Sequence, residues 1–294
     1  MSDDLLAAVA ASAGAPVADA RPVAGGDVNR ATRVDLADGR CLFVKHRPGA
    51  PGGMYRAEAD GLAWLSEANA LRLPRVVAVG EGEPAFLALE WVERGRPGPG
   101  HDERLGRGLA ALHRAGAPGF GLARDNWIGP LSQPNGPCPT WPEFYATRRL
   151  APMARAAAER GRLPARALAG VERLASRLED LCGPPEPPAR LHGDLWGGNA
   201  MSDAAGEPVL VDPAVYGGHR EVDLAMMRLF GGFSERVFAA YAEDFPLAPG
   251  HEDRVALYQL YPLLVHVALF GGAYAGSVER MLGRYAGGRS PAGR

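Results

Sequence analysis

LHGDLWGGNAMSDAAGEPVLVDPAVYGGHREVDLAMMRLFGGF, residues 191–233, contains the densest group of polar side chains in the sequence. Within it, Asp194 and Asn199 have four residues between them, and the apolar run 208–211 then leads to Asp212. A carboxylate can accept the proton of a hydroxyl, and an amide oxygen with a second carboxylate can bind Mg²⁺. Together these three side chains are the set that phosphoryl transfer requires.

The spacing of these residues matches the catalytic loop of the protein-kinase template, with two departures. His-Gly-Asp ending at Asp194 stands where the template has His-Arg-Asp, and Asp-Pro-Ala beginning at Asp212 stands where it has Asp-Phe-Gly. The missing arginine and phenylalanine are elements of activation-loop switching, which a small-molecule kinase does not need. Taken singly, each Asp or Asn is an ordinary turn former or helix cap. Their order, and a lysine and a glutamate upstream, favour catalysis.

The upstream lysine is the only one in the chain. Of the 32 Lys and Arg residues, Lys45 alone is a lysine, and abundant Arg, Ala, Gly and Pro offer a composition bias as the simple explanation. Lys45 ends the run CLFVK, and Glu58 follows thirteen residues later in a helical pattern. In the kinase template a strand lysine contacts the phosphates and a helix glutamate holds it. A compact ammonium suits that position better than the wide fork of arginine.

Two further segments are candidates for nucleotide contacts. The turn 25–29 places Gly25 and Gly26 where backbone N–H groups can cover phosphates, although it lacks the GxGxxG pattern. The segment Glu90-Trp91-Val92 is the expected connection between two lobes, where the backbone of Glu90 and Val92 can hydrogen-bond adenine. Neither a Walker A motif nor a dinucleotide-binding fingerprint is present in the sequence.

Composition excludes several classes of partner. The chain has 294 residues, a net charge of −2 and a pI near 6.4, so no basic surface for nucleic acid or an anionic membrane is expected. Three scattered cysteines lack CxxC spacing, which favours the cytoplasm over an oxidising compartment. The apolar N-terminal stretch follows acidic residues, so it predicts a short helix and no export signal.

The order of patterns along the chain indicates strands first and helices later. A hairpin around Asp38-Gly39, a helix and two more strands precede a Gly- and Pro-rich linker, and the expected ranges are 21–47, 54–70, 75–80, 84–92 and 93–100. Beyond the linker we expect two clear helices, a long ordered loop between them and two short β segments, at 105–114, 162–181, 125–142, 189–192 and 209–211.

One segment raises the question of a membrane span. Residues 255–276 carry no charged side chain, and their length would permit a crossing. Gln259, Pro262 and His266 interrupt the run, however, and no aromatic belts flank it. We therefore expect a buried core helix that is kinked or begun at Pro262.

The residues resemble those of a known family. The stretches that carry the resemblance are HGDLWGGN, DPAVY, GHREVDLAM and LFGGF, with GGDVN, VKH, AEADGLAWL, DNWIGPLSQPNG and LYPLLVHVALFGG in the rest of the chain. This set is similar to the fructosamine kinase (ketosamine-3-kinase) family, a branch of the protein-kinase-like fold near the aminoglycoside phosphotransferases. The resemblance covers nearly the whole chain.

The resemblance implies a bilobal α+β fold. A small β-rich N-terminal lobe with one main helix would span 1–92, and a larger, mostly helical C-terminal lobe would span 93–294. It also implies an ATP- and Mg²⁺-dependent kinase that phosphorylates the 3-hydroxyl of a ketosamine, either a small molecule or a glycated amine or protein. Phosphorylation there makes the adduct unstable, so the family is associated with deglycation. A cytoplasmic monomer or weak dimer without nucleic-acid or membrane partners is expected.

The resemblance also assigns roles to individual residues. Asp194 resembles the catalytic base, Asn199 and Asp212 the magnesium ligands, and Lys45 with Glu58 the phosphate-contacting pair.

Four side chains outside that set also receive expectations. Trp196 resembles the aromatic residue that lies against the sugar, with a half-buried packing role as an equal alternative. By analogy, Asp223 holds the backbone of the catalytic loop. His219 is a candidate for substrate contact, but packing beneath the loop is favoured for it and for Arg220. Two more side chains, His113 and His266, are expected to be hydrogen-bonded core histidines. The cysteine that permits redox-linked dimerisation in some family members is absent from 24–33.

Two alternatives stay open at this stage. The first is a kinase of the same fold that acts on another small alcohol, such as choline, homoserine or an aminoglycoside. A polycationic aminoglycoside would require several carboxylates around Asp194. The second is a catalytically dead nucleotide-binding regulator, against which the complete set of catalytic residue types argues.

Overall fold

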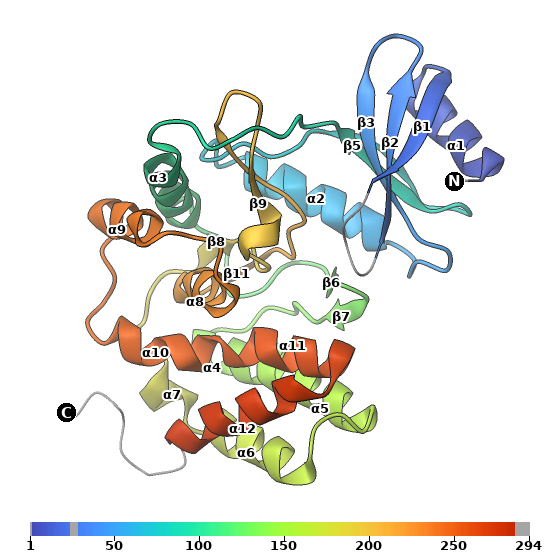
Figure 1. Ribbon diagram of the computed structural model, residues 1–294. Helices are drawn as coiled ribbons and strands as arrows, with labels where there is room; N and C mark the ends of the chain where they lie inside the picture. Colours follow the sequence, from blue (N-terminus) through green and yellow to red (C-terminus); the bar gives the residue numbers. More distant parts are fainter. Residues whose placement is uncertain (1, 24–28, 286–294) are drawn as a thin grey trace.

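The N-terminal part of the chain is one antiparallel sheet between two helices (Figure 1). The computed structural model describes residues 2–23 and 29–285. The sheet has the strand order β1-β2-β3-β5-β4. Its elements are α1 (Asp3–Ala13), β1 (Val17–Val23), β2 (Arg30–Leu36), β3 (Cys41–His46), α2 (Met54–Ser66), β4 (Val76–Gly80) and β5 (Phe86–Glu90).

The alternation of side chains along β3 decides which residues each face of the sheet presents to α1 or to α2. Leu42 and Val44 face α1 and pack with Leu5 and Val9 in a buried cluster. The opposite face, which carries Phe43, packs against α2. Because Lys45 is two residues beyond Phe43 on the same strand, it lies on the α2 side of the sheet.

The predicted strands and hairpin of this part are confirmed. Gly39 closes the turn between β2 and β3 with a left-handed φ of 85°, which suits the Asp-Gly dipeptide. The predicted helix begins at Met54 as expected but ends at Ser66 and not at Ala70, because the chain turns there and Asn69 adopts a φ of 49°.

The Gly- and Pro-rich segment 93–100 is packed along the C-terminal part. It runs beside the hairpin formed by β9 (Ala200–Ser202) and β10 (Pro208–Leu210), and the Gly95 N–H donates to the Ser202 carbonyl at 2.9 Å. A Cβ on Gly95 would lie 2.2 Å from the Asp203 carbonyl oxygen, so the close approach requires glycine. The lobe boundary predicted at residue 92 falls in this stretch between β5 and the next helix, and it stays a prediction.

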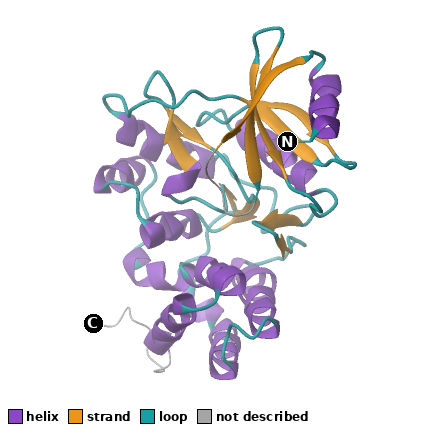
Figure 2. Ribbon diagram, turned by 45° about the vertical axis from the view of Figure 1, so that its right-hand side comes forward, coloured by secondary structure: helices purple, strands orange, loops and turns teal. Residues whose placement is uncertain are grey.

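The C-terminal part is mostly helical, as Figure 2 shows, with three short two-stranded sheets. Its helices are α3 (His101–Arg114), α4 (Trp141–Phe144), the π-helical segment η1 (Tyr145–Leu150), α5 (Ala151–Glu159), α6 (Ala165–Ala175), α7 (Leu178–Leu181), the 3₁₀ turn η2 (Gly197–Asn199), α8 (Glu221–Phe230), α9 (Glu235–Asp244), α10 (His251–Tyr258), α11 (Leu260–Phe270) and α12 (Ala273–Tyr285). The remaining strands are β6 (Asn126–Ile128), β7 (Leu131–Gln133), β8 (Ala189–Leu191) and β11 (Tyr216–Gly218).

Two predictions for this part are wrong. The range 162–181 is not one helix, because Arg177, with φ −119°, breaks it into α6 and α7. The range 125–142 is not only loop: β6 and β7 form a hairpin within it, and Gly129, with φ 55°, lies in the turn. Strands of three residues are too short to show an alternating pattern in the sequence.

The uncharged stretch 255–276 is divided among α10, α11 and the start of α12. Most of its apolar side chains lie in the largest core cluster, although Phe270 is 52% exposed. Pro262 lies in the first turn of α11, as expected for a helix begun there. Among the residues that the structure describes, no helix is long and apolar enough to cross a membrane.

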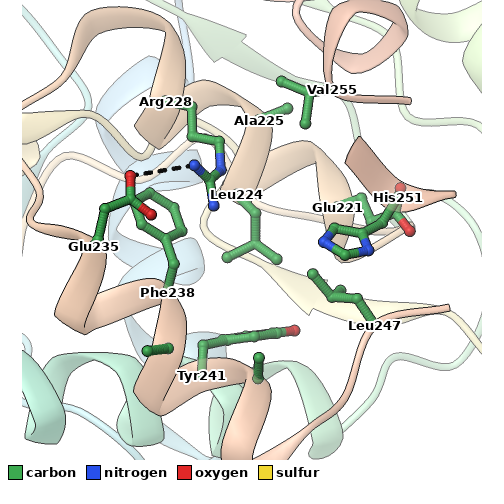
Figure 3. A pocket seen from close by; sticks show the side chains of 12 residues that line it. Glu221, Leu224, Ala225, Arg228, Glu235, Phe238, Tyr241, Leu247, His251 and Val255 are labelled. Carbon is green, nitrogen blue, oxygen red and sulfur yellow. Dashed lines mark hydrogen bonds and ion pairs between the residues drawn. The ribbon is translucent and has the colours of Figure 1, made fainter. Parts of the chain in front are cut away.

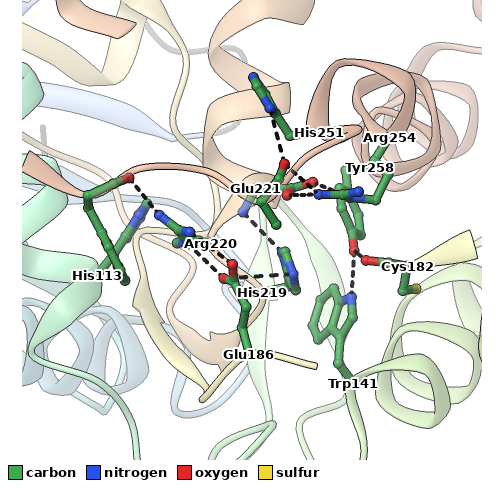
Figure 4. Close-up of polar contacts among 12 residues, drawn as sticks. His113, Trp141, Cys182, Glu186, His219, Arg220, Glu221, His251, Arg254 and Tyr258 are labelled. Atoms are coloured by element: carbon green, nitrogen blue, oxygen red, sulfur yellow. Dashed lines mark hydrogen bonds and ion pairs between the residues drawn. The ribbon is translucent and has the colours of Figure 1, made fainter. Parts of the chain in front are cut away.

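A buried ion pair ties α8 to α10 (Figure 4). Arg254 donates to both carboxylate oxygens of Glu221, at 2.8 and 2.6 Å, and both side chains are buried. A charge left without its partner in such a place costs far more than one at the surface. Arg166 and Glu279 form the same two-bonded pair on the surface between α6 and α12.

We expect Arg254→Leu to lower the free energy of unfolding by about 3 to 5 kcal/mol, because it leaves the Glu221 carboxylate buried and unpaired. The matched surface change, Arg166→Leu, should cost less than about 1 kcal/mol. Urea unfolding followed by circular dichroism measures both. Equal losses in the two variants would contradict the argument from burial.

Candidate active site

The loop between β8 and β9 is held by one buried carboxylate. Asp223, in the first turn of α8, accepts the backbone N–H of His192 at 2.8 Å and that of Gly193 at 2.9 Å. His113 lies 3.2 Å from the same carboxylate and 2.9 Å from the Tyr241 hydroxyl. Burial alone would raise the pKa of Asp223, but these hydrogen bonds and the nearby histidines lower it on balance. The carboxylate therefore stays charged and fixes the loop, the role predicted by analogy.

Gly193 occupies a position that no other residue fits. Its φ is 81°, and a Cβ built there would lie 2.0 Å from the Ala214 carbonyl oxygen. The segment after Asp212 thus fills the space that a side chain at this position would need. This explains in physical terms why His-Gly-Asp replaces the His-Arg-Asp of the kinase template.

His192 orders the same loop as a neutral ring. Its Nε2 lies 2.9 Å from the Val211 carbonyl oxygen, and the Asp194 N–H donates to its Nδ1 at 3.3 Å. Burial lowers its pKa despite the carboxylates of Asp223 and Asp212. In the neutral ring Nε2 carries the proton and Nδ1 accepts, which satisfies both contacts.

Asp194 and Asn199 are joined by the amide of Asn199. Its Nδ2 donates to the Asp194 backbone oxygen at 2.8 Å, to the Asp194 carboxylate at 3.1 Å and to the Asp212 backbone oxygen at 3.4 Å. Burial, and then the negative charge of Asp212, raises the pKa of Asp194 to about 7, while the Asn199 bond opposes the rise. A carboxyl group with such a pKa is suited to proton transfer near neutral pH.

Lys45 brings the two lobes together. Its Nζ lies 2.6 Å from Glu58 Oε1 on α2 and 2.7 Å from Asp212 Oδ1, which follows β10 in the C-terminal part. Burial would lower the pKa of Lys45, but Asp212 and Glu58 raise it on balance, so the ammonium remains charged. The structure thus joins all five polar residues predicted from the sequence around one point.

The donor atoms at this point fit a divalent cation that is also bound by phosphate oxygens. The Asn199 nitrogen is committed to three acceptors, which leaves its Oδ1 as the free oxygen, and the Asp212 side chain is 43% exposed. Within the described parts of the chain, no three His, Cys, Asp or Glu side chains cluster as a metal site. Mg²⁺ is commonly held by one or two protein oxygens together with substrate phosphates, so the two findings agree.

The predicted adenine contacts lie at the end of β5. The N–H groups of Glu90 and Trp91 donate to the carbonyls of Arg75 and Cys41, so Glu90 can offer a base only its carbonyl oxygen. Among the described residues none accepts the Val92 N–H. Of the predicted adenine contacts, the Val92 N–H therefore remains available as a donor. The predicted phosphate contacts Gly25 and Gly26 lie outside the described residues.

Trp196 lies two residues after Asp194 in the chain and is 43% exposed. The indole covers Gly198, where a Cβ would lie 2.3 Å from the ring, and Gly197 packs on Gly231 and Gly232. The exposed face of the indole suits a sugar ring, and the sugar contact stays a prediction.

His219 does not fit the substrate contact considered for it, whereas the packing role favoured for it agrees with its position. The ring is 3% exposed and stacks on Tyr258, with centroids 5.3 Å apart. Its nearest carboxylate is Glu186, at 3.8 Å (Figure 4). Burial, opposed by Glu186, lowers its pKa to about 4. Arg220 is also buried and paired with Glu186.

A cavity of about 310 Å³ lies between α8, α9 and α10 (Figure 3). Leu224, Phe238, Tyr241 and Leu247 line it, with Arg228 at one side. None of the predicted catalytic, metal or nucleotide residues borders it. The cavity is therefore separate from the chemistry assembled around Asp194.

Sequence reasoning missed three buried amides near the site. Asn126, Gln133 and Asn135 lie under the segment that follows Asp212, and the first two donate to its backbone. They come from DNWIGPLSQPNG, which was expected to be an ordered loop. The available signal was the concentration of amide side chains in a loop of that kind.

Comparisons with known proteins agree with this geometry. The family model described as fructosamine kinase matches residues 1–286. A probable ketoamine kinase from Enterococcus faecium is 41% identical over 263 residues, which cover 89% of this chain and 93% of that protein. A chloroplastic protein-ribulosamine 3-kinase from Arabidopsis thaliana is 34% identical over 270 residues, covering 90% of this chain and 81% of that one.

Solved structures extend the comparison. The crystal structure of a candidate fructosamine-3-kinase from Thermobifida fusca matches with a TM-score of 0.87 and 44% identity, over 97% of this chain and 100% of that one. A type I macrolide 2′-phosphotransferase matches with a TM-score of 0.61 and 19% identity, over 95% of this chain and 96% of that one, which shows a shared fold alone. The expected α+β, protein-kinase-like fold is confirmed.

The lack of room for a side chain at Gly193 predicts a large loss of stability when a Cβ is added there. Gly193→Ala should cost several times more stability than Gly39→Ala. Both residues have a positive φ, but only at Gly193 would the new Cβ overlap a backbone oxygen, that of Ala214 at 2.0 Å. The strain at Gly39 alone should be about 1 to 2 kcal/mol. Thermal unfolding compares the two variants, and similar losses would show that the Ala214 carbonyl can move aside.

Proposed function

The chain belongs to the fructosamine kinase family, and from this premise we propose that it transfers the γ-phosphoryl group of ATP to the 3-hydroxyl of a ketosamine. The observation that supports the proposal most directly is the meeting of Asp194 and Asn199 with the Lys45–Asp212 pair. A nucleotide-binding protein without catalysis has no use for a half-buried carboxyl group whose pKa is raised to about 7.

In the proposed reaction Asp194 orients the acceptor hydroxyl and takes its proton. The hydroxyl oxygen forms a bond to the γ-phosphorus while the bond from that phosphorus to the oxygen of ADP breaks. Most of the acceleration comes from positioning and from neutralised charge, because the phosphoryl group needs little covalent help.

Lys45 and Glu58 are proposed to hold the phosphates, and Asn199 and Asp212 to hold Mg²⁺. Glu58 fixes the ammonium at 2.6 Å, so the charge is in position before a nucleotide arrives. The metal would supply positive charge to the phosphate oxygens. The Glu90 carbonyl, the Val92 N–H and the neighbouring Trp91 would form the adenine contact.

The charges around Asp194 favour a ketosamine over a polycation. The carboxylates whose charge acts on Asp194 are those of Asp212 and Asp223. Asp212 is paired with Lys45, and Asp223 is engaged by the loop backbone and His113. An aminoglycoside would need free carboxylates, whereas the exposed Trp196 offers an apolar face to a sugar ring.

The product would be an unstable phosphorylated adduct, which makes deglycation the proposed role. Glycated small amines and glycated proteins are both proposed substrates. A cytoplasmic location, a monomeric or weakly dimeric state and the lack of nucleic-acid and membrane partners remain proposals from composition.

An ADP-release assay across fructosamines, ribulosamines, choline, homoserine and an aminoglycoside tests the function. We expect Mg²⁺-dependent turnover with the ketosamines alone. Asp194→Asn should reduce turnover by about 10² to 10⁴-fold, because the amide cannot accept the proton, while ADP binding measured by calorimetry stays within a few-fold. Preference for another alcohol, or full activity in Asp194→Asn, would overturn the proposal.

Lys45→Arg tests whether the chain's only lysine is kept for its shape. The guanidinium is wider than the ammonium that fits between Glu58 and Asp212, so kcat/KM for ATP should fall by about 100-fold through misplacement of the phosphates. The opposite exchange on the surface, Arg166→Lys, should change kcat/KM by less than about twofold. Near-normal ATP use in Lys45→Arg would show that charge alone is required.

A further inference from the structure

Buried amide side chains donate hydrogen bonds to the backbone of the segment that follows Asp212. The Gln133 Nε2 donates to the Ala214 carbonyl at 3.1 Å, and the Asn126 Nδ2 donates to the Val215 carbonyl at 2.9 Å. Both side chains come from the β6–β7 hairpin, and each is at most 5% exposed. Two consecutive carbonyls, two and three residues after the proposed metal ligand, are thus held by side chains from another part of the fold.

A hydrogen-bonded network fixes the orientation of these amides. The Asn126 Oδ1 accepts from Gln133 at 2.8 Å and from Asn135 at 2.7 Å. The Gln133 Oε1 accepts from the Tyr261 hydroxyl of α11 at 2.6 Å. Because the oxygens are engaged by donors, the NH₂ groups must face the carbonyls of the Asp212 segment.

Arg149 anchors the far end of the network. It is fully buried, donates to the Asn135 Oδ1 at 2.7 Å and to the Pro134 carbonyl at 2.6 Å, and stacks on Tyr216 with 3.7 Å between its Cζ and the ring centroid. Within the described part of the chain it pairs with no carboxylate. A permanently charged group is expensive to bury, and it lies in the π-helical turn η1, a type of distortion frequent at functional sites.

The segment that the amides hold begins at Asp212, and the backbone of Asp212 is strained. Asp212 has a φ of 56°, the left-handed region that a non-glycine residue enters only at a cost. Such a conformation persists when its surroundings fix it on several sides. Here the Ala214 N–H also donates to the His192 carbonyl at 2.9 Å, so the clamped segment rests directly on the catalytic loop.

We propose that Gln133, Asn126, Asn135 and Arg149 form an amide clamp that positions Asp212 for the metal–nucleotide complex. The clamp holds the strained backbone so that the Asp212 carboxylate meets Lys45 and the Asp212 backbone oxygen meets the Asn199 amide. These are positioning residues, since none of them touches the reacting groups. The inference rests on the proposed function, because it requires a metal-bound nucleotide at Asp212.

The clamp also gives a physical reason for the departure from Asp-Phe-Gly. The segment after Asp212 could change conformation only by breaking the buried hydrogen bonds that its carbonyls accept from Gln133 and Asn126.

Gln133→Met tests the clamp against Gln259→Met. Gln259 also donates through its Nε2 to a backbone carbonyl, that of Ala225, at 3.0 Å, but it lies between α10 and α11, outside the clamp. Calorimetry measures ADP affinity with Mg²⁺ and with EDTA, and thermal unfolding measures stability. Only Gln133→Met should weaken Mg²⁺–ADP binding, by about tenfold, which corresponds to the loss of one hydrogen bond. Its affinity for metal-free ADP should stay within about twofold of wild type.

Two matched tyrosine variants test the clamp if Gln133→Met does not fold. Tyr261→Phe removes the donor to Gln133, whereas Tyr145→Phe removes an equally buried hydroxyl that donates to the Leu257 carbonyl at 2.9 Å. Tyr261→Phe should weaken Mg²⁺–ADP binding two- to fourfold, and Tyr145→Phe should leave it unchanged. Equal loss of stability with unchanged metal dependence in the Gln133 or Tyr261 variant would overturn the clamp. If wild-type protein itself showed no Mg²⁺-dependent ADP binding, the proposed function would fail instead.

Discussion

The ammonium of Lys45 is the interaction on which the site depends, because it is the point where three separate parts of the chain meet. β3 supplies the lysine, α2 supplies Glu58, and the end of β10 supplies Asp212. Two carboxylates at such short range would repel each other without the cation between them. The burial of the lysine makes the charge costly unless both acids are present. The three groups therefore require one another, and together they set how the sheet lies against the C-terminal part.

A second constraint is the contact of two backbones. The backbone at Gly193 and the carbonyl of Ala214 approach so closely that position 193 must be glycine. The Ala214 carbonyl must also stay in place for this contact to persist. Asp223 holds the first from α8, and Gln133 holds the second from the β6–β7 hairpin. The departures from the protein-kinase motifs are consequences of this packing. A protein kinase uses the corresponding segments to switch, whereas here both are pinned by buried polar side chains.

Much of the site was predictable because its signals are local in sequence. Asp194 and Asn199 lie within one loop, and the lysine is the last residue but one of a strand that is recognisable by its alternation. The β6–β7 hairpin, by contrast, has strands too short for a period, and the break at Arg177 has no Gly or Pro to mark it. The clamp joins residues that are 81 and 89 positions apart, so no local pattern reveals it. His219 was ambiguous because a histidine beside a catalytic segment looks the same whether it faces outward or, as here, packs on Tyr258.

The raised pKa of Asp194 links the proposed base to the proposed metal site. Burial and the charge of Asp212 are what disfavour its ionised form. Any cation that neutralises Asp212 removes one of those two causes, so cation binding and ionisation of Asp194 favour each other. Linkage makes this coupling reciprocal: an ionised Asp194 attracts the cation as strongly as the cation promotes ionisation. Asn199 reinforces the coupling, since its nitrogen bonds the Asp194 carboxylate while its oxygen is left for the metal. The proposed base would thus gain its charge when a cation binds at Asp212.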